Sequence, residues 1–228
     1  MNTTAPIEHS GHSFALQDVG IFPGHMPETP PAQSGPQFDA ALRLIQSRRN
    51  VSPRRLVEPG PTQQQLTDIL SAAAAAPDHG LQMPWRFVVV PVGKRHVLAE
   101  AFALALIDRD PGATLEQMEA AREKACRAPF LMLAIVRLGV ADQAIPAAER
   151  LVSLGCAVQN VLLAATAAGF GSGLTSGQSM ASPRLSSACG VAEDEQLVCC
   201  VSIGTVSKSK TSRIRPDVSA FVSELPRN

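Results

Sequence analysis

The most constraining feature of this sequence is a long helical pattern in its second half. Its apolar residues recur at helical spacing, at Leu151, Leu154, Val158, Val161, Leu162 and Ala165. Gly169 follows where a helix C-terminal glycine is expected. Because the segment is apolar on most of its surface, we expect a long central helix that other elements cover.

Further helices are predicted on both sides of this one. An amphipathic helix runs from Phe38 into Arg48 and Arg49, so its C-terminal end presents two arginines. Capping boxes predict the starts of two more helices, and a Ser-Pro start with a later glycine bounds a short one. These signals, with one further helical stretch, are Thr62 with Gln65, Thr114 with Gln117, residues 94–107, and Ser182-Pro183 followed by Gly190.

Three apolar, β-branched runs predict buried strands, at residues 87–92, 130–136 and 196–203. Helices outnumber strands, and no strand-helix-strand unit repeats cleanly along the chain. We therefore predict an α+β fold in which helices flank a mixed sheet.

Length and composition allow one domain of ordinary size. A chain of 228 residues with 45% hydrophobic content can build one substantial core, and a second large domain would not fit. Residues 1–35 are rich in proline, glycine and serine and have no helical or strand period, so we expect a flexible N-terminal arm. The folded domain is then expected over residues 36–228.

The charge balance and hydropathy argue against two classes of partner. Twenty Lys and Arg residues balance twenty Asp and Glu residues, so nothing suggests a nucleic acid or a membrane surface. No run approaches the roughly 18 apolar residues that span a bilayer, and the polar N-terminus lacks a signal-peptide pattern. We expect a cytoplasmic protein.

The five cysteines show neither a disulfide framework nor a metal-ligand spacing. Walker, HExxH and GxSxG motifs are also absent from the sequence, so neither a metal site nor a catalytic side chain is assigned. Reduced, mostly buried thiols are expected. Cys199 and Cys200 are adjacent in a predicted strand, where a vicinal disulfide would be strained, so a redox role there is disfavoured.

One glycine-rich segment, Gly169-Phe170-Gly171-Ser172-Gly173, looks like part of a dinucleotide fingerprint. It follows a helix and precedes a strand, which reverses the order that binds a pyrophosphate at a helix N-terminus. A helix stop followed by a tight turn is therefore the better interpretation.

Three polar clusters are candidate binding sites, and each has an ordinary structural alternative. Arg48-Arg49-Asn50 fits an anion site, or cations that satisfy the last carbonyls of a helix. The loop over residues 78–85 combines an Asp-His turn with the only tryptophan. A basic tail is either solvated or placed near an anion, and it contains Lys208, Lys210 and Arg213.

Seven short motifs in a fixed order resemble the nitroreductase family, and within it the short, minimal YdjA-like branch. The resemblance runs from about Phe38 to Phe221. Each motif is weak alone, but the seven in this order are specific. They are Ser47-Arg48-Arg49-Asn50, Glu58-Pro59, Ala76-Pro77-Asp78-His79, Pro84-Trp85, Gly155-Cys156-Ala157-Val158-Gln159-Asn160, Gly169-Phe170-Gly171 and Ile203-Gly204-Thr205.

The resemblance implies an interleaved homodimer that holds FMN at the subunit interface. Arg48, Arg49 and Asn50 match the family motif for the phosphate and ribityl chain, and Lys208 or Lys210 would close the phosphate site. The other implied contacts are His79 from the partner subunit with Gln82 and Met83 beside it, and Leu174, Thr175 and Ser176 along the flavin ring.

Some positions depart from the family pattern. Asn50 replaces the usual serine, while Ala75 and Thr175 stand where the minimal branch has arginine, so the pocket near the ring is expected to be less cationic. The stretch from Leu154 to Gln159 matches one that relatives use for the nicotinamide nucleotide. Its small residues would equally serve close helix packing.

The implied activity is electron transfer from NAD(P)H through FMN to an electron-poor small molecule such as a nitroaromatic or a quinone. The flavin carries this chemistry, so no side chain is expected to be catalytic. Two alternatives stay open: a specialised reaction on the same scaffold, such as dehalogenation or flavin fragmentation, and a non-catalytic flavin-binding or interaction protein. The short connection over residues 99–114 offers little lid for the specialised reactions.

Overall fold

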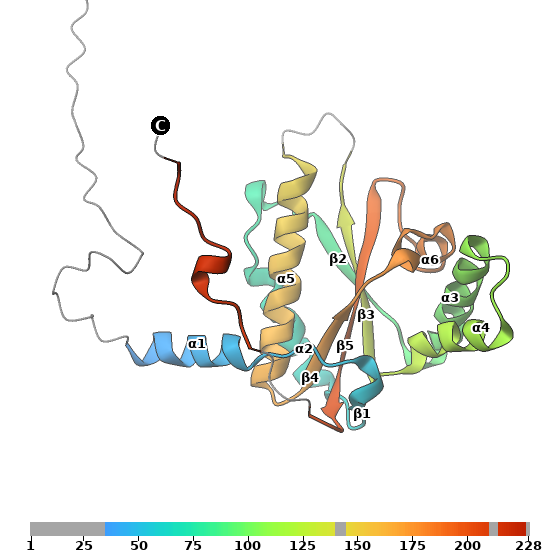
Figure 1. The fold of residues 1–228 in the computed structure, drawn as a ribbon, viewed down its shortest axis with the longest axis horizontal. Helices are drawn as coiled ribbons and strands as arrows, with labels where there is room; N and C mark the ends of the chain where they lie inside the picture. Colours follow the sequence, from blue (N-terminus) through green and yellow to red (C-terminus); the bar gives the residue numbers. More distant parts are fainter. Residues whose placement is uncertain (1–34, 140–144, 210–213, 227–228) are drawn as a thin grey trace, which may run out of the picture. The chain divides into compact units, whose positions relative to one another are not determined.

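A computed structural model describes residues 35–139, 145–209 and 214–226 of the chain (Figure 1). The chain divides into two compact units, Met1–Asp39 and Ala40–Asn228. Except for Gly35, the expected arm over residues 1–35 lies outside the described residues. The folded core and the candidate site belong to the second unit.

Five strands form one sheet in the order β1-β5-β3-β2, with β4 paired to β5. Every pairing between these strands is antiparallel. Among the described residues, the one parallel contact is an isolated bridge between Asn50 and Ser172, so the five-stranded sheet is antiparallel and not mixed as expected. The strands are β1 (Leu56–Val57), β2 (Trp85–Val89), β3 (Phe130–Arg137), β4 (Gly171–Thr175) and β5 (Glu195–Val206).

The helices begin close to where local signals place them. Thr62 and Thr114 accept hydrogen bonds from the backbone three residues later, which confirms both capping boxes. Ser182 caps the short helix that starts with Pro183. The helices are α1 (Pro36–Ser47), α2 (Gln63–Ser71), α3 (Arg95–Arg109), α4 (Leu115–Arg122), α5 (Ala147–Ala167) and α6 (Pro183–Ala188).

Strand β3 shows that helices cover both faces of the sheet. Its residues from Phe130 to Val136 are all buried. Met132 and Ala134 pack in a core with α2 and α5, whereas Leu131 and Leu133 pack in a second core with α3, α4 and α6. Figure 1 shows the sheet between these two groups of helices, which confirms an α+β fold built as three layers.

The strand predicted over 87–92 is shifted toward the N-terminus and is β2, from Trp85 to Val89. Pro91 explains the earlier end, because a proline has no N–H with which to continue the pairing. Val92 belongs instead to a 3-10 turn that leads into α3. The strand therefore starts directly at the tryptophan of the candidate loop.

The long helix α5 corrects the expectation that no segment approaches the length of a membrane span. Over its 21 residues it is long and apolar enough, by length and composition, to cross a bilayer. A core helix of a soluble protein passes the same test, and the inner face of α5 is buried against the sheet at Leu154, Ala157, Val158 and Val161. The helix is thus weak support for a membrane span.

The glycines of the 169–173 segment have separate structural roles. Gly169 has a φ of 85° just after α5, as a helix-ending glycine does. At Gly173 a Cβ atom would collide with the backbone carbonyl of Val51, and at Gly171 it would collide with the side chains of Val206 and Leu56. The interpretation as a helix stop is confirmed, and the two later glycines allow close approach of the chain on either side of β4.

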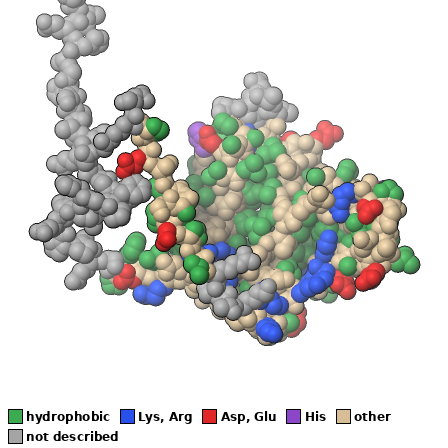
Figure 2. Space-filling model, viewed as in Figure 1, with side chains coloured by type: hydrophobic (Ala, Val, Ile, Leu, Met, Phe, Trp, Pro, Cys, Tyr) green, Lys and Arg blue, Asp and Glu red, His purple; other side chains and the backbone are tan. Residues whose placement is uncertain are grey.

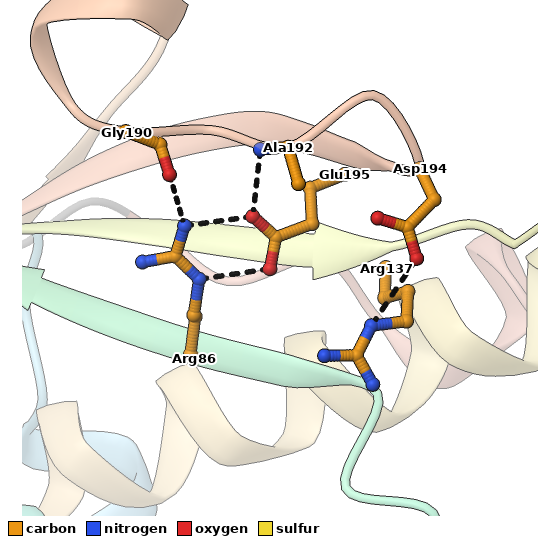
Figure 3. Close-up of polar contacts among 6 residues, drawn as sticks. All are labelled: Arg86, Arg137, Gly190, Ala192, Asp194 and Glu195. Atoms are coloured by element: carbon orange, nitrogen blue, oxygen red, sulfur yellow. Dashed lines mark hydrogen bonds and ion pairs between the residues drawn. The ribbon is translucent and has the colours of Figure 1, made fainter.

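A buried carboxylate ties β2 to the start of β5. Glu195 accepts hydrogen bonds from Nε and Nη2 of Arg86 at 2.8 and 2.7 Å and from the Ala192 N–H at 3.0 Å (Figure 3). Arg86 also donates to the Gly190 carbonyl. These hydrogen bonds lower the pKa of Glu195 from 4.5 to about 2, the contact with Arg86 having the largest effect.

Glu195→Gln is expected to remove an acid-dependent part of the stability. A carboxyl whose pKa is lowered in the folded state stabilises the protein above its unfolded pKa of 4.5, and this contribution is lost as the pH falls toward about 2. The difference corresponds to at most about 3 kcal/mol, and to about 2 kcal/mol after solvent screening of the partly exposed Arg86. Urea unfolding from pH 7 to pH 2.5 measures it.

The matched control for this experiment is Glu123→Gln, because Glu123 pairs with Arg127 on the surface at 3.4 Å. Exposed pairs contribute little, so this variant should follow the wild-type pH dependence within about 0.5 kcal/mol. An identical slope for wild type and Glu195→Gln between pH 4.5 and 2.5 would contradict the assigned role of Glu195.

All five cysteines are free, as expected. Burial raises the pKa of Cys199 to about 11 and that of Cys200 to about 12. Both thiols are therefore protonated at neutral pH, and a buried neutral thiol is a poor nucleophile. This agrees with an inert pair in the core.

Candidate functional site

The Arg48-Arg49-Asn50 segment lies beside β4. It follows α1 directly, and Asn50 forms the parallel bridge to Ser172, with the Val51 N–H donating to the Ser172 carbonyl at 2.8 Å. The Asn50 side chain contacts the end of the same strand. Its Oδ1 accepts from the Leu174 N–H at 2.7 Å, and its Nδ2 donates to the Leu174 carbonyl at 3.2 Å. Two predicted site segments, 124 residues apart, are therefore joined.

Arg48 carries positive charge in a partly buried position. Burial lowers the pKa of its guanidinium, and the nearby charge of Arg215 lowers it further. Arg215 also donates from Nη2 to the Arg48 backbone carbonyl at 3.0 Å. Across the described ranges, no ion pair between two residues involves Arg48, Arg49 or Arg215. An anionic ligand would offset the repulsion between the guanidinium groups of Arg48 and Arg215.

The basic tail approaches the same region through the end of β5. Arg55 donates from Nη1 to the backbone carbonyl of Lys208 at 3.3 Å, and Lys208 itself is exposed. Lys210 and Arg213 lie outside the described residues. Figure 2 shows Lys and Arg side chains along the lower edge of the molecule, near β1 in Figure 1. The contact with Arg55 thus places the Lys208 backbone beside the chain segment that follows Arg48–Asn50.

The loop between α2 and β2 has an unusual backbone. Gly80, Leu81 and Met83 all have positive φ, at 73°, 52° and 42°. Non-glycine residues rarely adopt this conformation, and such strain is concentrated at functional sites. The Asp78 carboxylate accepts the Met83 N–H at 2.6 Å and so holds the loop in place. The Asp-His turn therefore has a structural role beside any binding role.

Helix α5 fixes two side chains of this loop. His79 Nδ1 lies 2.8 Å from Glu149 Oε2 in the first turn of α5, and both side chains are at least half exposed. One turn later the buried Ser153 accepts a hydrogen bond from Trp85 Nε1 at 3.0 Å. Leu81 and Met83 are exposed at 91% and 62% of their surface. The loop thus presents an oriented imidazole and two apolar side chains outward.

The site residues form two separate groups within one subunit. In the part of the chain that the structure describes, no hydrogen bond or ion pair joins His79, Gln82 or Met83 to the group around Arg48 and Leu174. A groove of about 710 Å³ lies elsewhere, between α3 and α6, where Arg184 pairs with Asp108. None of the predicted cofactor residues lines it.

The remaining predicted positions also differ in their surroundings. Thr175 and Ser176 are exposed after Leu174, and the Ser176 hydroxyl donates to the Val198 carbonyl at 2.8 Å. Ala75 is exposed near the loop. In the stretch matched to the nicotinamide nucleotide, Leu154 and Ala157 are buried in the core, whereas no described atom lies within 4 Å of a Cβ atom placed on Gly155. Packing within the subunit therefore explains Ala157 but not Gly155.

Two residues of the site were not predicted from the sequence. Arg215 lies just beyond the basic tail, and the alternation of Arg213 and Arg215 was its only signal. Glu149 is an acidic residue in the first turn of a helix, a position that the helix dipole explains by itself. Among the described residues, no group of three His, Cys, Asp or Glu side chains is arranged to hold a metal ion.

A three-layer α+β fold with arginines near the end of β4 that form no ion pair among the described residues suits a phosphorylated ligand, and comparison with known proteins narrows the class. The sequence pattern described as "Nitroreductase family" matches residues 45–205. The chain belongs to the nitroreductase family.

The relatives support this assignment over most of the chain. The Escherichia coli K12 protein named "Putative NAD(P)H nitroreductase YdjA" is 35% identical over 184 residues, which is 80% of this chain and 98% of the relative. A nitroreductase-like protein from Bacillus cereus has a TM-score of 0.71 at 18% identity, covering 81% of this chain and 95% of its own. A Bacteroides fragilis nitroreductase with bound FMN has a TM-score of 0.61 at 22% identity, covering 81% and 98%.

Proposed function

We propose that the protein is an FMN-dependent oxidoreductase that takes electrons from NAD(P)H and delivers them to a nitroaromatic, quinone or similar electron-poor acceptor. The observation that carries the proposal is the convergence of the Arg48–Asn50 segment and Leu174 in one place. Family membership and a relative named for NAD(P)H nitroreductase chemistry support it. The FMN-bound structural neighbour supports the choice of cofactor.

The residues present fit the chemistry of FMN. Arg48, Arg49 and Arg215, with Lys208 nearby, supply the guanidinium and ammonium donors that a phosphate requires, and they lack carboxylate partners among the described residues. Arginine forks bind phosphate oxygens in pairs, so Arg48 and Arg49 would hold the phosphate. Lys210, which lies outside the described residues, remains a predicted second lysine.

The segment 174–176, at the C-terminal end of β4, would border the ring. Leu174, Thr175 and Ser176 are exposed at the end of a strand whose other edge is fixed on β5. When bound, FMN supplies the hydride-transfer chemistry, so the protein has to place it, shield one side and leave the other open to small molecules. With threonine at position 175 rather than arginine, this edge carries no positive charge.

We infer that a homodimer completes the site. Helix α1 buries none of its residues, and its apolar side chains Phe38, Leu42 and Ile45 are 59%, 38% and 50% exposed. Phe221 and Leu225 near the C-terminus are 68% and 91% exposed. Exposed apolar surface on this scale indicates an interface. A partner seated there would bring the partner's own loop, with His79, Gln82 and Met83, toward the flavin.

The outer face of α5 would receive the nicotinamide nucleotide. Gly155 leaves room there that the subunit itself does not use.

The two alternative functions, a specialised reaction and a non-catalytic flavin protein, have less support. Helix α3 extends to Arg109, so only residues 110–114 connect it to α4 and little chain is available for the lid of a specialised reaction. A non-catalytic flavin protein would bind FMN without turnover.

The visible spectrum of the purified protein tests the proposal. We expect a yellow protein whose flavin absorbance bleaches on addition of NADH or NADPH without oxygen and returns when a quinone is added. A colourless protein that does not bind added FMN in a titration would refute flavin binding. Bound FMN that neither nucleotide bleaches would instead support the non-catalytic alternative.

A further inference from the structure

Asn50 stands where the family motif has serine, and its side chain has a task that serine cannot perform. Oδ1 accepts the Leu174 N–H at 2.7 Å while Nδ2 donates to the carbonyl of the same residue at 3.2 Å. A carboxamide carries its donor and its acceptor on two separate atoms in one plane, like a peptide group, whereas serine has one oxygen for both functions on a shorter side chain. The Asn50 side chain therefore binds Leu174 as a neighbouring strand would.

The backbone explains why a side chain is needed here. The Val51 N–H donates to the Ser172 carbonyl at 2.8 Å, which begins a parallel ladder along β4. In a regular ladder, the N–H of residue 53 would next donate to the Leu174 carbonyl. Residue 53 is a proline that starts a 3-10 turn, so it has no N–H to offer. Asn50 supplies the missing donor through Nδ2, and its Oδ1 also accepts the Leu174 N–H.

We propose that Asn50 is a positioning residue that acts through Leu174, rather than a direct phosphate or ribityl ligand. It fixes the exposed end of β4 from one side, while β5 fixes it from the other through the Ser176 hydroxyl and the Val198 carbonyl at 2.8 Å. The segment 174–176 is the one expected to border the flavin ring, so this inference rests on the proposed function. Replacing Asn50 should change the environment of the flavin ring and leave phosphate binding by Arg48 and Arg49 unchanged.

The test compares two variants. Asn50→Leu removes both hydrogen bonds at similar size, and Asn50→Ser restores the family residue but leaves one oxygen on a shorter side chain in place of two separate polar atoms. Gln46→Leu, one turn earlier on α1, is the control for loss of an exposed carboxamide. Hydrogen exchange of the 171–176 backbone is measured on the FMN-loaded protein. Loss of two hydrogen bonds should speed exchange of the Leu174 amide about tenfold in Asn50→Leu, and less in Asn50→Ser.

The second readout is the flavin itself. We expect a shifted visible spectrum and midpoint potential in Asn50→Leu, with FMN content near that of wild type, and no shift in Gln46→Leu. Unchanged exchange and unchanged flavin spectrum in Asn50→Leu would overturn the inference. Loss of FMN in Asn50→Leu with wild-type exchange over 171–176 would also overturn it, because Asn50 would then be a direct ligand.

These outcomes separate the inference from the proposed function. A wild-type protein that binds no FMN refutes the proposed function, whatever the exchange data show. A wild-type protein that binds FMN, together with an Asn50→Leu variant of unchanged exchange and spectrum, refutes the positioning role alone. If Asn50→Leu does not fold, the Asn50→Ser variant still yields both measurements.

Discussion

Replacing Arg48 and Arg49 together by alanine is expected to abolish flavin binding while leaving the protein folded. Hydrogen bonds from a charged donor contribute about 1.5 to 3 kcal/mol each, so the loss of two guanidinium contacts should weaken FMN binding by at least about a hundredfold. Arg215 donates to the backbone carbonyl of Arg48, a contact that alanine retains. The ratio of flavin to protein absorbance after gel filtration measures the effect.

The matched control is Arg43→Ala, which removes an exposed arginine from the preceding turn of α1. It should keep its FMN and its elution volume. Each single variant should lose part of the flavin, and Arg48→Ala should lose more, because Arg48 is partly buried and lies near Arg215. Full FMN content in the double variant would show that the phosphate binds elsewhere.

Gly173→Ala is expected to have the largest effect on stability. A Cβ atom at this position would collide with the carbonyl oxygen of Val51, which is backbone and cannot swing away as a side chain would. Either β4 or the 50–51 segment must move, and overpacking of this kind costs about 2 to 4 kcal/mol. The same shift would displace the backbone beside Arg48 and Arg49, the two proposed phosphate ligands, so flavin content should fall as well. Urea unfolding and the absorbance ratio measure the two effects.

Gly93→Ala is the control for this substitution. No described atom lies within 4 Å of a Cβ atom placed at Gly93, and its φ is not in the left-handed region. Its unfolding midpoint should stay close to that of wild type, within about 0.5 kcal/mol. A Gly173→Ala protein with wild-type stability and wild-type flavin content would contradict the close approach of β4 and Val51.

Features set by near neighbours in the chain were predictable from the sequence. The capping boxes at Thr62 and Thr114 and the glycine after α5 follow the predictions, because each depends on hydrogen bonds or backbone angles within a few residues. Helix α5 was predicted from periodicity alone, since its buried face repeats at helical spacing. The ends of β2 were predicted incorrectly, because the limits of a strand depend on pairing with a partner strand.

The site could be predicted only in part. The family resemblance assigned Arg48, Asn50 and Leu174 to one flavin site, but the sequence did not show that Asn50 would bind the backbone of Leu174. Nor did the sequence show that Arg215 donates to the backbone carbonyl of Arg48, or that the Glu149 carboxylate contacts the His79 side chain. Each of these pairs joins residues at least 70 positions apart, and local pattern carries no information on such contacts.

The sequence by itself determined the helices, the buried strands, the inert cysteines and the order of motifs that marks the family. These follow from side-chain periodicity and from short-range hydrogen bonds, which each segment carries with it. Only the tertiary structure decided that β3 is covered on both faces, that Gly173 must lack a side chain, and that Asn50 completes a strand edge which Pro53 cannot. Those features arise where distant segments compete for the same space and the same backbone hydrogen bonds.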